Sequence, residues 1–289
     1  MKKNVLMVVN PISGGIDKLE IIEAAVNFVA KKKQYLIQYK TSGKGDISKI
    51  KALYEKYKPE RIIIIGGDGT IKMVAEAIEN QDVILGILPA GSSNGLAVDL
   101  DLMKTIDENL EIAFQDHFKE LDTIAINGKK CFHLSDLGLN AELVKNYEKS
   151  DIRGKWGYIL QALHTLIDLG EPFMATIKAN NHTYKSQARM IVIANSKKYG
   201  TGVTINPKGD MNDGKFELVI LKSLDLIVFG KIISGNIPVG SDDVQIISTD
   251  KATIKTNFPV SFQIDGEYCG VENYLEIKML SQKIKVAVP

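Results

Sequence analysis

The stretch that most constrains the fold is the apolar run RIIIIGG, from Arg61 to Gly67. It holds four consecutive isoleucines and therefore has no polar position that could face water. Strands of this kind lie in the middle of parallel sheets, where helices cover both faces. The run predicts a central strand of a parallel α/β sheet.

Strand-like and helix-like segments alternate around this run, from residue 4 to about residue 120. Short apolar runs occur at 4–10, 35–40, 61–67 and 83–89, and apolar residues recur at helical spacing in 16–33, 46–58, 69–80 and 105–115. Strands and helices in alternation predict crossover units and a parallel sheet.

After residue 121 the pattern changes to short strands separated by turns. Asn127-Gly128 and Asn180-Asn181 predict two hairpins. Further strands are expected at 215–222, 243–249, 251–256, 260–268, 274–280 and 283–289, with helices at 141–169 and 225–235. The sequence therefore predicts an α/β domain over 1–121 and a mostly β domain, a sandwich or barrel, over 122–289. Whether the C-terminal segment returns to the first domain stays open.

Charge and cysteine content argue against several classes of protein. Lys and Arg total 36 against 35 acidic residues, so the net charge of +1 creates no field that would attract nucleic acid. Cys131 and Cys269 lie far apart and form neither a disulfide framework nor a zinc spacing. No stretch approaches the roughly 18 to 20 apolar residues of a spanning helix, and the apolar start is too short for a signal peptide. We expect a cytoplasmic protein without a nucleic-acid partner.

The central run ends in a loop of small residues around a carboxylate, GGDGT at 66–70. Ligands of α/β sheets bind at the carboxyl ends of the strands, and glycine lets the backbone approach them closely. A helix that begins near Thr70 can receive phosphate on its free N–H groups. In the alternative interpretation the loop is an ordinary turn and Asp68 caps the helix. The loop is not a GxGxxG fingerprint, because Lys72 stands where the last glycine would be.

Two other predicted strands end in similar loops. NPISGG follows the first strand at 10–15, and AGSSNG follows the fourth at 90–95. Each loop alone could be a helix cap. Three such loops on one edge of a sheet predict a site that binds phosphate.

These loops, in this order, resemble the catalytic domain of the diacylglycerol kinase and sphingosine kinase family of lipid kinases, and above all its small bacterial members. The resemblance continues through LDTIAINGKKCFHLSDLGLNAELV, GKWGYILQAL, NSKKYGTGVTINPKGDMNDGKFELVIL, IDGE and KVAVP, and so covers nearly the whole chain. It implies a phosphofructokinase- or NAD-kinase-like α/β domain followed by a β-sandwich, with the active site in the cleft between them. It also implies ATP and Mg²⁺ as cofactors and a lipid hydroxyl as the phosphate acceptor. The residues implied to contact the nucleotide are Asn10, Pro11, Ser13, Gly14, Thr41, Gly66, Gly67, Asp68, Gly69, Thr70, Lys72, Gly91, Ser92 and Asn94.

The IDGE segment holds the second candidate constellation, Asp265 and Glu267. Acids two residues apart on a strand face the same side. The resemblance implies that Glu267 is the general base and that Asp265 assists it or holds metal. Asp68 is an alternative base, because sphingosine kinases use the aspartate of this loop. A plain hairpin corner at Asp265-Gly266 is the other interpretation.

The resemblance also implies a structural Mg²⁺ site in DMNDGKF, at 210–216. Asp213 would supply a carboxylate, and Asp210 and Lys215 would supply main-chain carbonyls. Oxygen ligands suit Mg²⁺, and Asp122 is expected near this network. An ordinary Asn-Asp-Gly turn is the alternative.

Two departures leave the substrate open. The family's usual Gly-Thr-x-Asn-Asp is GSSNG here, so Gly95 removes a carboxylate, and GLNA at 138–141 replaces Gly-Phe-Asp-Ala. Diacylglycerol-like lipids, phosphatidylglycerol, a sphingoid base or a polyprenol would fit, and an NAD kinase, a sugar kinase or a regulatory nucleotide-binding protein is the alternative function. We expect peripheral membrane contact, with 150–170 as a candidate surface unless it packs on the sandwich. Oligomeric state is open, with a homodimer as one alternative.

Overall fold

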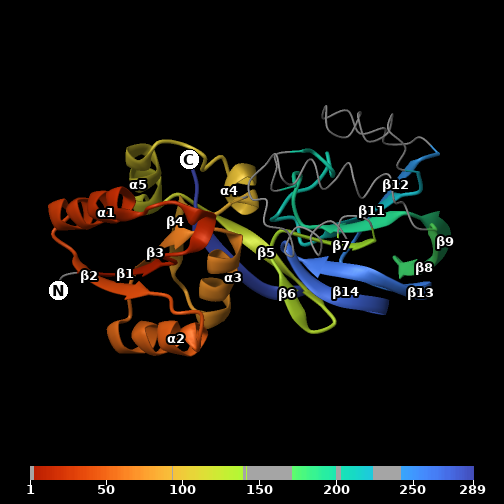
Figure 1. The fold of residues 1–289 in the computed structure, drawn as a ribbon, viewed down its shortest axis with the longest axis horizontal. Coiled ribbons are helices and arrows are strands. Elements are labelled where there is room, and N and C mark those ends of the chain that lie inside the picture. The colour runs from red at the N-terminus through yellow and green to blue at the C-terminus, as the bar shows by residue number, and fades with distance from the viewer. Residues whose placement is uncertain (1–2, 93, 139–140, 142–170, 200–202, 224–241) are drawn as a thin grey trace. The chain divides into compact units, whose positions relative to one another are not determined.

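The computed structural model describes residues 3–92, 94–138, 141, 171–199, 203–223 and 242–289 (Figure 1). The predicted helices at 141–169 and 225–235, and the candidate membrane surface at 150–170, lie outside these residues. The chain divides into two compact units, Met1–Leu121 with Gln282–Pro289, and Asp122–Ser281.

The first unit is a parallel sheet with helices. Its strands β1 to β4 run in the spatial order β2-β1-β3-β4, and the end of β14 pairs in parallel with β4 through Lys285 and Val286. The strands and helices are β1 (Asn4–Val9), η1 (Ser13–Gly15), α1 (Leu19–Lys31), β2 (Tyr35–Lys40), α2 (Asp46–Tyr57), β3 (Arg61–Gly66), α3 (Asp68–Ala77), β4 (Ile84–Pro89), α4 (Gly95–Asp99), α5 (Ile106–Phe114) and β14 (Glu267–Ala287).

The strand β3 lies between β1 and β4, and every residue of it is buried. This confirms the central strand predicted from the isoleucine run. Alternate residues face opposite layers: Ile63 and Ile65 pack with Ala25 of α1 and Leu110 of α5. Helices α1 and α5 lie on one face of this sheet and α2 and α3 on the other (Figure 1).

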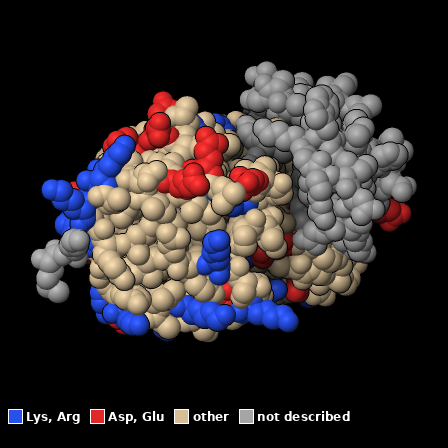
Figure 2. Space-filling view, turned by 60° about the vertical axis from the view of Figure 1, so that its left-hand side comes forward, with Lys and Arg blue, Asp and Glu red and all other residues tan. Residues whose placement is uncertain are grey.

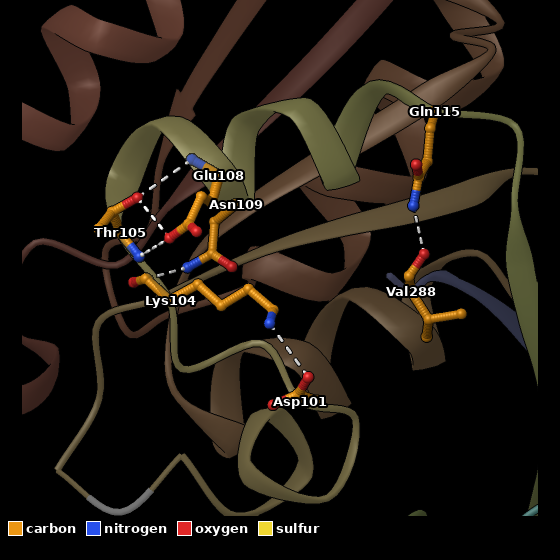
Figure 3. Close-up of polar contacts among 7 residues, drawn as sticks. All are labelled: Asp101, Lys104, Thr105, Glu108, Asn109, Gln115 and Val288. Atoms are coloured by element: carbon orange, nitrogen blue, oxygen red, sulfur yellow. Dashed lines mark hydrogen bonds and ion pairs between the residues drawn. The ribbon is translucent and has the colours of Figure 1, made fainter.

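The helix α5 begins in a capping box. The Thr105 hydroxyl accepts from the Glu108 N–H, and the Glu108 carboxylate accepts from the Thr105 N–H (Figure 3). Beyond the other end of the helix, the Gln115 amide donates to the carbonyl of Val288, in the C-terminal segment (Figure 3). Both ends of α5 are therefore held by side chains.

The second unit is antiparallel. Strands β12-β11-β10-β7-β13-β14 are neighbours in this order. In addition, β8 pairs with residues 252–256 of β13, and β9 pairs with β8. The strands are β5 (Phe118–Ile126), β6 (Lys129–Cys131), β7 (Leu134–Gly138), β8 (Phe173–Ala179), β9 (His182–Ala188), β10 (Met190–Ala194), β11 (Phe216–Leu221), β12 (Val244–Thr249) and β13 (Lys251–Ile264).

Both predicted hairpins are present. Asn127 and Gly128 form a two-residue turn with φ of +47° and +79°, and Asn180 and Asn181 do so with +52° and +61°. Asparagine and glycine adopt these left-handed conformations at low cost. Separate strands were predicted at 251–256 and 260–268. The structure instead has one strand, β13, that runs from Lys251 to Ile264 with an irregular register between Lys255 and Val260.

Charged side chains of both signs surround a broad uncharged area on the face shown in Figure 2. No helix among the described residues is long and apolar enough to span a bilayer.

Candidate active site

Three loops meet at the carboxyl edge of the parallel sheet, and we call 10–15, 66–70 and 90–95 the glycine loops. A Cβ atom built on Gly91 would lie 2.4 Å from the Cα of Gly67, and one built on Gly67 would lie 2.8 Å from the Cα of Gly91. Real Cβ atoms do not come so close to backbone. The second and third loops therefore pack main chain against main chain, and only glycine fits at the contact.

The first glycine loop joins the other two through hydrogen bonds. The Ser13 hydroxyl donates to the carbonyl of Ala90 at 2.9 Å, and the Asn10 amide donates to the Thr70 hydroxyl at 3.1 Å. Gly14 has a left-handed φ of +66°, and a Cβ there would lie 2.8 Å from the oxygen of Ala90. Residues of all three predicted loops are thus in mutual contact.

Asp68 lies at the first residue of α3, but its carboxylate holds a different helix. Its two oxygens accept from the N–H groups of Gly95 at 2.7 Å and Leu96 at 3.0 Å, at the start of α4. Unpaired N–H groups at a helix start need such an acceptor. Asp68 is a cap, as the alternative interpretation had it, but of α4 and not of the helix that follows it in sequence.

Asn94 is engaged within its own loop. Its side-chain oxygen accepts from Gly91 N–H at 2.8 Å, and its amide donates to the Gly91 carbonyl at 3.0 Å. It adopts a left-handed φ of +52°, which asparagine tolerates. Asn94 therefore shapes the third glycine loop by holding Gly91 in place.

The remaining predicted nucleotide residues of this unit lie on or beside the same edge. Gly69 is exposed on α3, Lys72 is half-buried one turn further along, and Ser92 is exposed in the third loop. Pro11 lies in the first loop. The Thr70 side chain lies close to Gly66, because a Cβ atom built on Gly66 would be 2.5 Å from the Thr70 hydroxyl oxygen. Thr41 is buried directly after β2, where its N–H donates to the carbonyl of Val9 at 2.9 Å.

Asp46 organises the loop that follows Thr41, and sequence reasoning missed it. The carboxylate accepts from the Tyr39 hydroxyl at 2.5 Å and from the N–H groups of Ser42 at 2.9 Å and Gly43 at 2.7 Å. The hydrogen bond from Tyr39, followed by those from the loop, lowers the pKa of Asp46 to about 2, and burial together with Asp46 raises the pKa of Tyr39 to about 12. The signal available in the sequence was an aspartate directly after Gly45 at a predicted helix start.

The IDGE segment corrects one expectation. Asp265 and Gly266 are the two-residue turn between β13 and β14, with φ of +50° and +82°, and Ile264 pairs with Glu267 across it. The premise that both acids lie on one strand is wrong, because a tight turn separates them. Asp265 accepts from the N–H groups of Phe132 at 3.2 Å and His133 at 2.9 Å, whereas Glu267 is exposed.

A buried glutamine supports this turn. Gln263, 2% exposed, accepts from the Gly266 N–H at 2.7 Å and donates to the carboxylate of the fully buried Asp136. Burial of such groups is tolerated when they are hydrogen-bonded. Neither residue was a candidate in the sequence, because a glutamine and an aspartate within strands carry no motif.

The predicted metal segment is a turn tied to Asp122. The Asp122 carboxylate accepts from Gly214 N–H at 2.7 Å, Asp213 accepts from Lys215 N–H at 2.9 Å, and Asp210 accepts from Asn212 N–H at 3.2 Å. The atoms predicted to bind the cation are all oxygens, which suits Mg²⁺. Asp210 and Asp213 are exposed. No group of three or more His, Cys, Asp or Glu side chains gathers as a metal site in the described part of the chain. A cation here would therefore depend on main-chain carbonyls as well.

Comparison with known proteins identifies two family domains. Residues 4–126 match the diacylglycerol kinase catalytic domain, and residues 136–288 match the YegS C-terminal NAD kinase beta sandwich-like domain. The second match covers more than half of the chain, so the chain belongs to the family with the YegS C-terminal domain, and it carries a diacylglycerol kinase catalytic domain in front of it. This confirms the resemblance and the predicted fold class, and it makes the chain a kinase.

Curated relatives that match this chain over most of their own length support the assignment. A Streptococcus pneumoniae protein whose name describes a lipid kinase is 23% identical over 98% of this chain and 97% of its own length. A similarly named Staphylococcus carnosus protein is 25% identical over 77% of this chain and 75% of its own. Two diacylglycerol kinase structures from Bacillus anthracis show the same fold, with TM-scores of 0.81 and 0.78 and identities of 22% and 19%, over 99% of this chain and 97% of each of those chains.

Proposed function

We propose that this kinase transfers the γ-phosphate of ATP to the hydroxyl group of a lipid, in a reaction that needs Mg²⁺. The observation that carries the proposal is the contact of the glycine loops, where Gly67 and Gly91 leave no room for a side chain and bring the main chains of two loops together. Main-chain N–H groups at such loops and at helix starts bind phosphate. A lipid acceptor is proposed because the catalytic domain is that of a diacylglycerol kinase.

Bound ATP would supply the phosphoryl group, and Mg²⁺ would neutralise its charge. The glycine loops, Thr41 and Lys72 would hold the triphosphate in line with the acceptor. Lys72 supplies positive charge, which matters because the chain has only three arginines. Asp213, with the carbonyls of Asp210 and Lys215, would hold a structural Mg²⁺ in the second unit.

We assign the general base to Glu267 and a positioning role to Asp68. Both oxygens of Asp68 already accept backbone hydrogen bonds from α4, so its place in the structure is explained without proton transfer. Glu267 is an exposed carboxylate directly after the turn that Gln263 and Asp265 hold. It would accept the proton of the attacking hydroxyl. Access to a lipid implies peripheral contact with a membrane surface.

The first experiment measures ADP release from ATP and Mg²⁺ with lipid alcohols in mixed micelles, namely diacylglycerol, phosphatidylglycerol, a sphingoid base and a polyprenol. NAD serves as the soluble acceptor, because the second domain matches an NAD kinase-like sandwich. We expect one lipid to stimulate turnover. Turnover with NAD alone would overturn the lipid assignment. ATP binding without turnover on any acceptor would favour a regulatory protein, to which Gly95 in place of the usual carboxylate points.

Three variants test the residue roles in the same assay. Glu267→Gln should lower turnover by about 10²- to 10⁴-fold, the range for loss of a general base. Asp68→Asn should also lose activity, with weaker ATP binding, because an amide nitrogen would face a backbone N–H. Glu276→Gln, an exposed acid on the same strand as Glu267, is the control and should keep full turnover. Full activity in Glu267→Gln would refute the assignment of the base.

A further inference from the structure

Lys18 is a buried lysine directly before α1, and its ammonium group lies inside the turn formed by the first glycine loop. The residue is 3% exposed. Nζ donates to the carbonyls of Ser13 at 2.5 Å, Ile16 at 3.1 Å and Pro11 at 3.4 Å. Burial lowers the pKa of Lys18 from its ordinary value. A buried ammonium is costly unless it is fully hydrogen-bonded.

The three carbonyls use all three N–H donors of the ammonium. Lys18 therefore has no donor left for direct contact with a ligand. What it can do is orient the loop and place a positive charge beneath it. This distinguishes Lys18 from an exposed lysine, which reaches a phosphate with its own N–H groups.

The orientation of the loop follows from peptide geometry. In a trans peptide the carbonyl and the next N–H point in opposite directions, and the described chain holds no cis peptide. Because the Ser13 carbonyl points at Lys18, the Gly14 N–H points away from it. The Ile16 carbonyl turns the Asp17 N–H outward in the same way. The left-handed φ of Gly14, +66°, allows this arrangement, which is typical of loops that bind anions through successive N–H groups.

We infer that Lys18 is a positioning residue for polyphosphate: its buried ammonium holds the carbonyls of Pro11, Ser13 and Ile16. This turns the N–H groups of Gly14 and Asp17 outward and places a positive charge behind them. The inference rests on the proposed binding of a nucleotide at the glycine loops. Lys18 would add a positive charge near the bound phosphates, in a chain that has only three arginines. The sequence alone did not identify this residue.

The test is a binding series that varies the number of phosphates. ATP, ADP, AMP, adenosine and inorganic triphosphate are titrated by calorimetry into the wild-type chain and into Lys18→Met, without lipid. We expect Lys18→Met to weaken ATP and triphosphate about tenfold or more, ADP and AMP progressively less, and adenosine about twofold or less, because charge interactions scale with ligand charge. Lys31→Met, which removes an exposed lysine from the other end of α1, is the control and should bind every ligand normally.

Two results would overturn the inference: unchanged ATP affinity in Lys18→Met, or an equal loss for adenosine and ATP, which would mean a merely structural role. If Lys18→Met does not fold, as judged by circular dichroism, Lys18→Gln carries the same series, since its amide keeps two donors without the charge. The wild-type chain separates this inference from the proposed function. If it binds ATP and triphosphate but phosphorylates no lipid, the proposed function fails while the role of Lys18 is still decided by the series.

Discussion

At the scale of single residues, Asp46 shows how one buried carboxylate shapes the end of a strand. It is 4% exposed and accepts hydrogen bonds from Tyr39, Ser42 and Gly43. These bonds hold the backbone that directly follows Thr41, one of the residues proposed to contact the nucleotide. Hydrogen bonds to a charged acceptor are worth more than those between neutral groups. The loop after β2 therefore depends on a residue that itself need not touch a ligand.

Removal of the Tyr39 hydroxyl should destabilise the chain. Tyr39→Phe is expected to lower the free energy of unfolding by about 1.5–3 kcal/mol, the range for a hydrogen bond to a charged group. Urea denaturation followed by circular dichroism measures the change. Tyr35→Phe, at an exposed position of the same strand, should change little. Equal stability of Tyr39→Phe and the wild type would show that the bond contributes nothing.

The same carboxylate predicts the direction of a pH dependence. The pKa of Asp46 is about 2 in the folded chain, below the ordinary value of about 3.9. The contribution of the Asp46 carboxylate to folding stability is therefore complete above about pH 4 and is lost as the pH falls through about 2. Asp46→Asn lacks this titration, so the stability difference between it and the wild type should be constant from about pH 7 to 5 and shrink below about pH 4. A difference that stays constant down to pH 2 would contradict the assignment.

At the scale of secondary-structure elements, α5 has a start that sequence rules describe well. The residues TIDE at 105–108 have the spacing of a capping box, and the structure contains both reciprocal hydrogen bonds (Figure 3). Such a cap satisfies N–H groups that the helix leaves unpaired. The helix packs its buried face against α1 and the sheet, so its start bears on the core of the first unit.

Loss of this cap should have a moderate effect. Thr105→Ala is expected to cost about 1 kcal/mol of stability, because the Glu108 N–H loses its acceptor. Chemical denaturation provides the measurement. Thr105→Ser keeps the hydroxyl and should stay close to the wild type; if it is as unstable as Thr105→Ala, the loss comes from the methyl group and not from the cap.

At the scale of the whole chain, the last residues complete the first unit. Lys285 and Val286 pair with β4, the Lys285 ammonium lies 2.6 Å from Asp82, and the Val288 N–H donates to the carbonyl of His117. Without this segment β4 would become an edge strand with unpaired backbone groups. The unit is therefore assembled from two pieces of sequence more than 150 residues apart.

Deletion of 282–289 should loosen β4 selectively. Hydrogen exchange measured by mass spectrometry is expected to show faster exchange at 84–89 in the shortened chain, because its amides and carbonyls lose a neighbouring strand. Peptides from β10 and β11, which belong to the second unit, serve as the internal control. Unchanged protection of β4 would mean that the C-terminal pairing does not stabilise this unit.

Much of this architecture follows from local patterns. The isoleucine run predicted a buried central strand, and the Asn-Gly and Asn-Asn pairs predicted hairpins, because these features depend on residues next to each other in the sequence. The same local reasoning failed at Asp265 and Glu267. Two acids two residues apart share a face only if the strand continues, and here the left-handed conformations of Asp265 and Gly266 turn the chain back instead.

By itself, the sequence determined the alternation of elements, the family and the identity of the glycine loops, since each is written in contiguous residues. Only the tertiary structure decided which side chain serves which backbone. Asp68 caps α4, at Gly95 and Leu96, Lys18 holds three carbonyls, and Gln263 links Asp136 to the turn before Glu267. The physical reason is that a hydrogen bond forms only within a narrow range of distance and angle between donor and acceptor. Tertiary packing sets that distance and angle for residues that are distant in the chain.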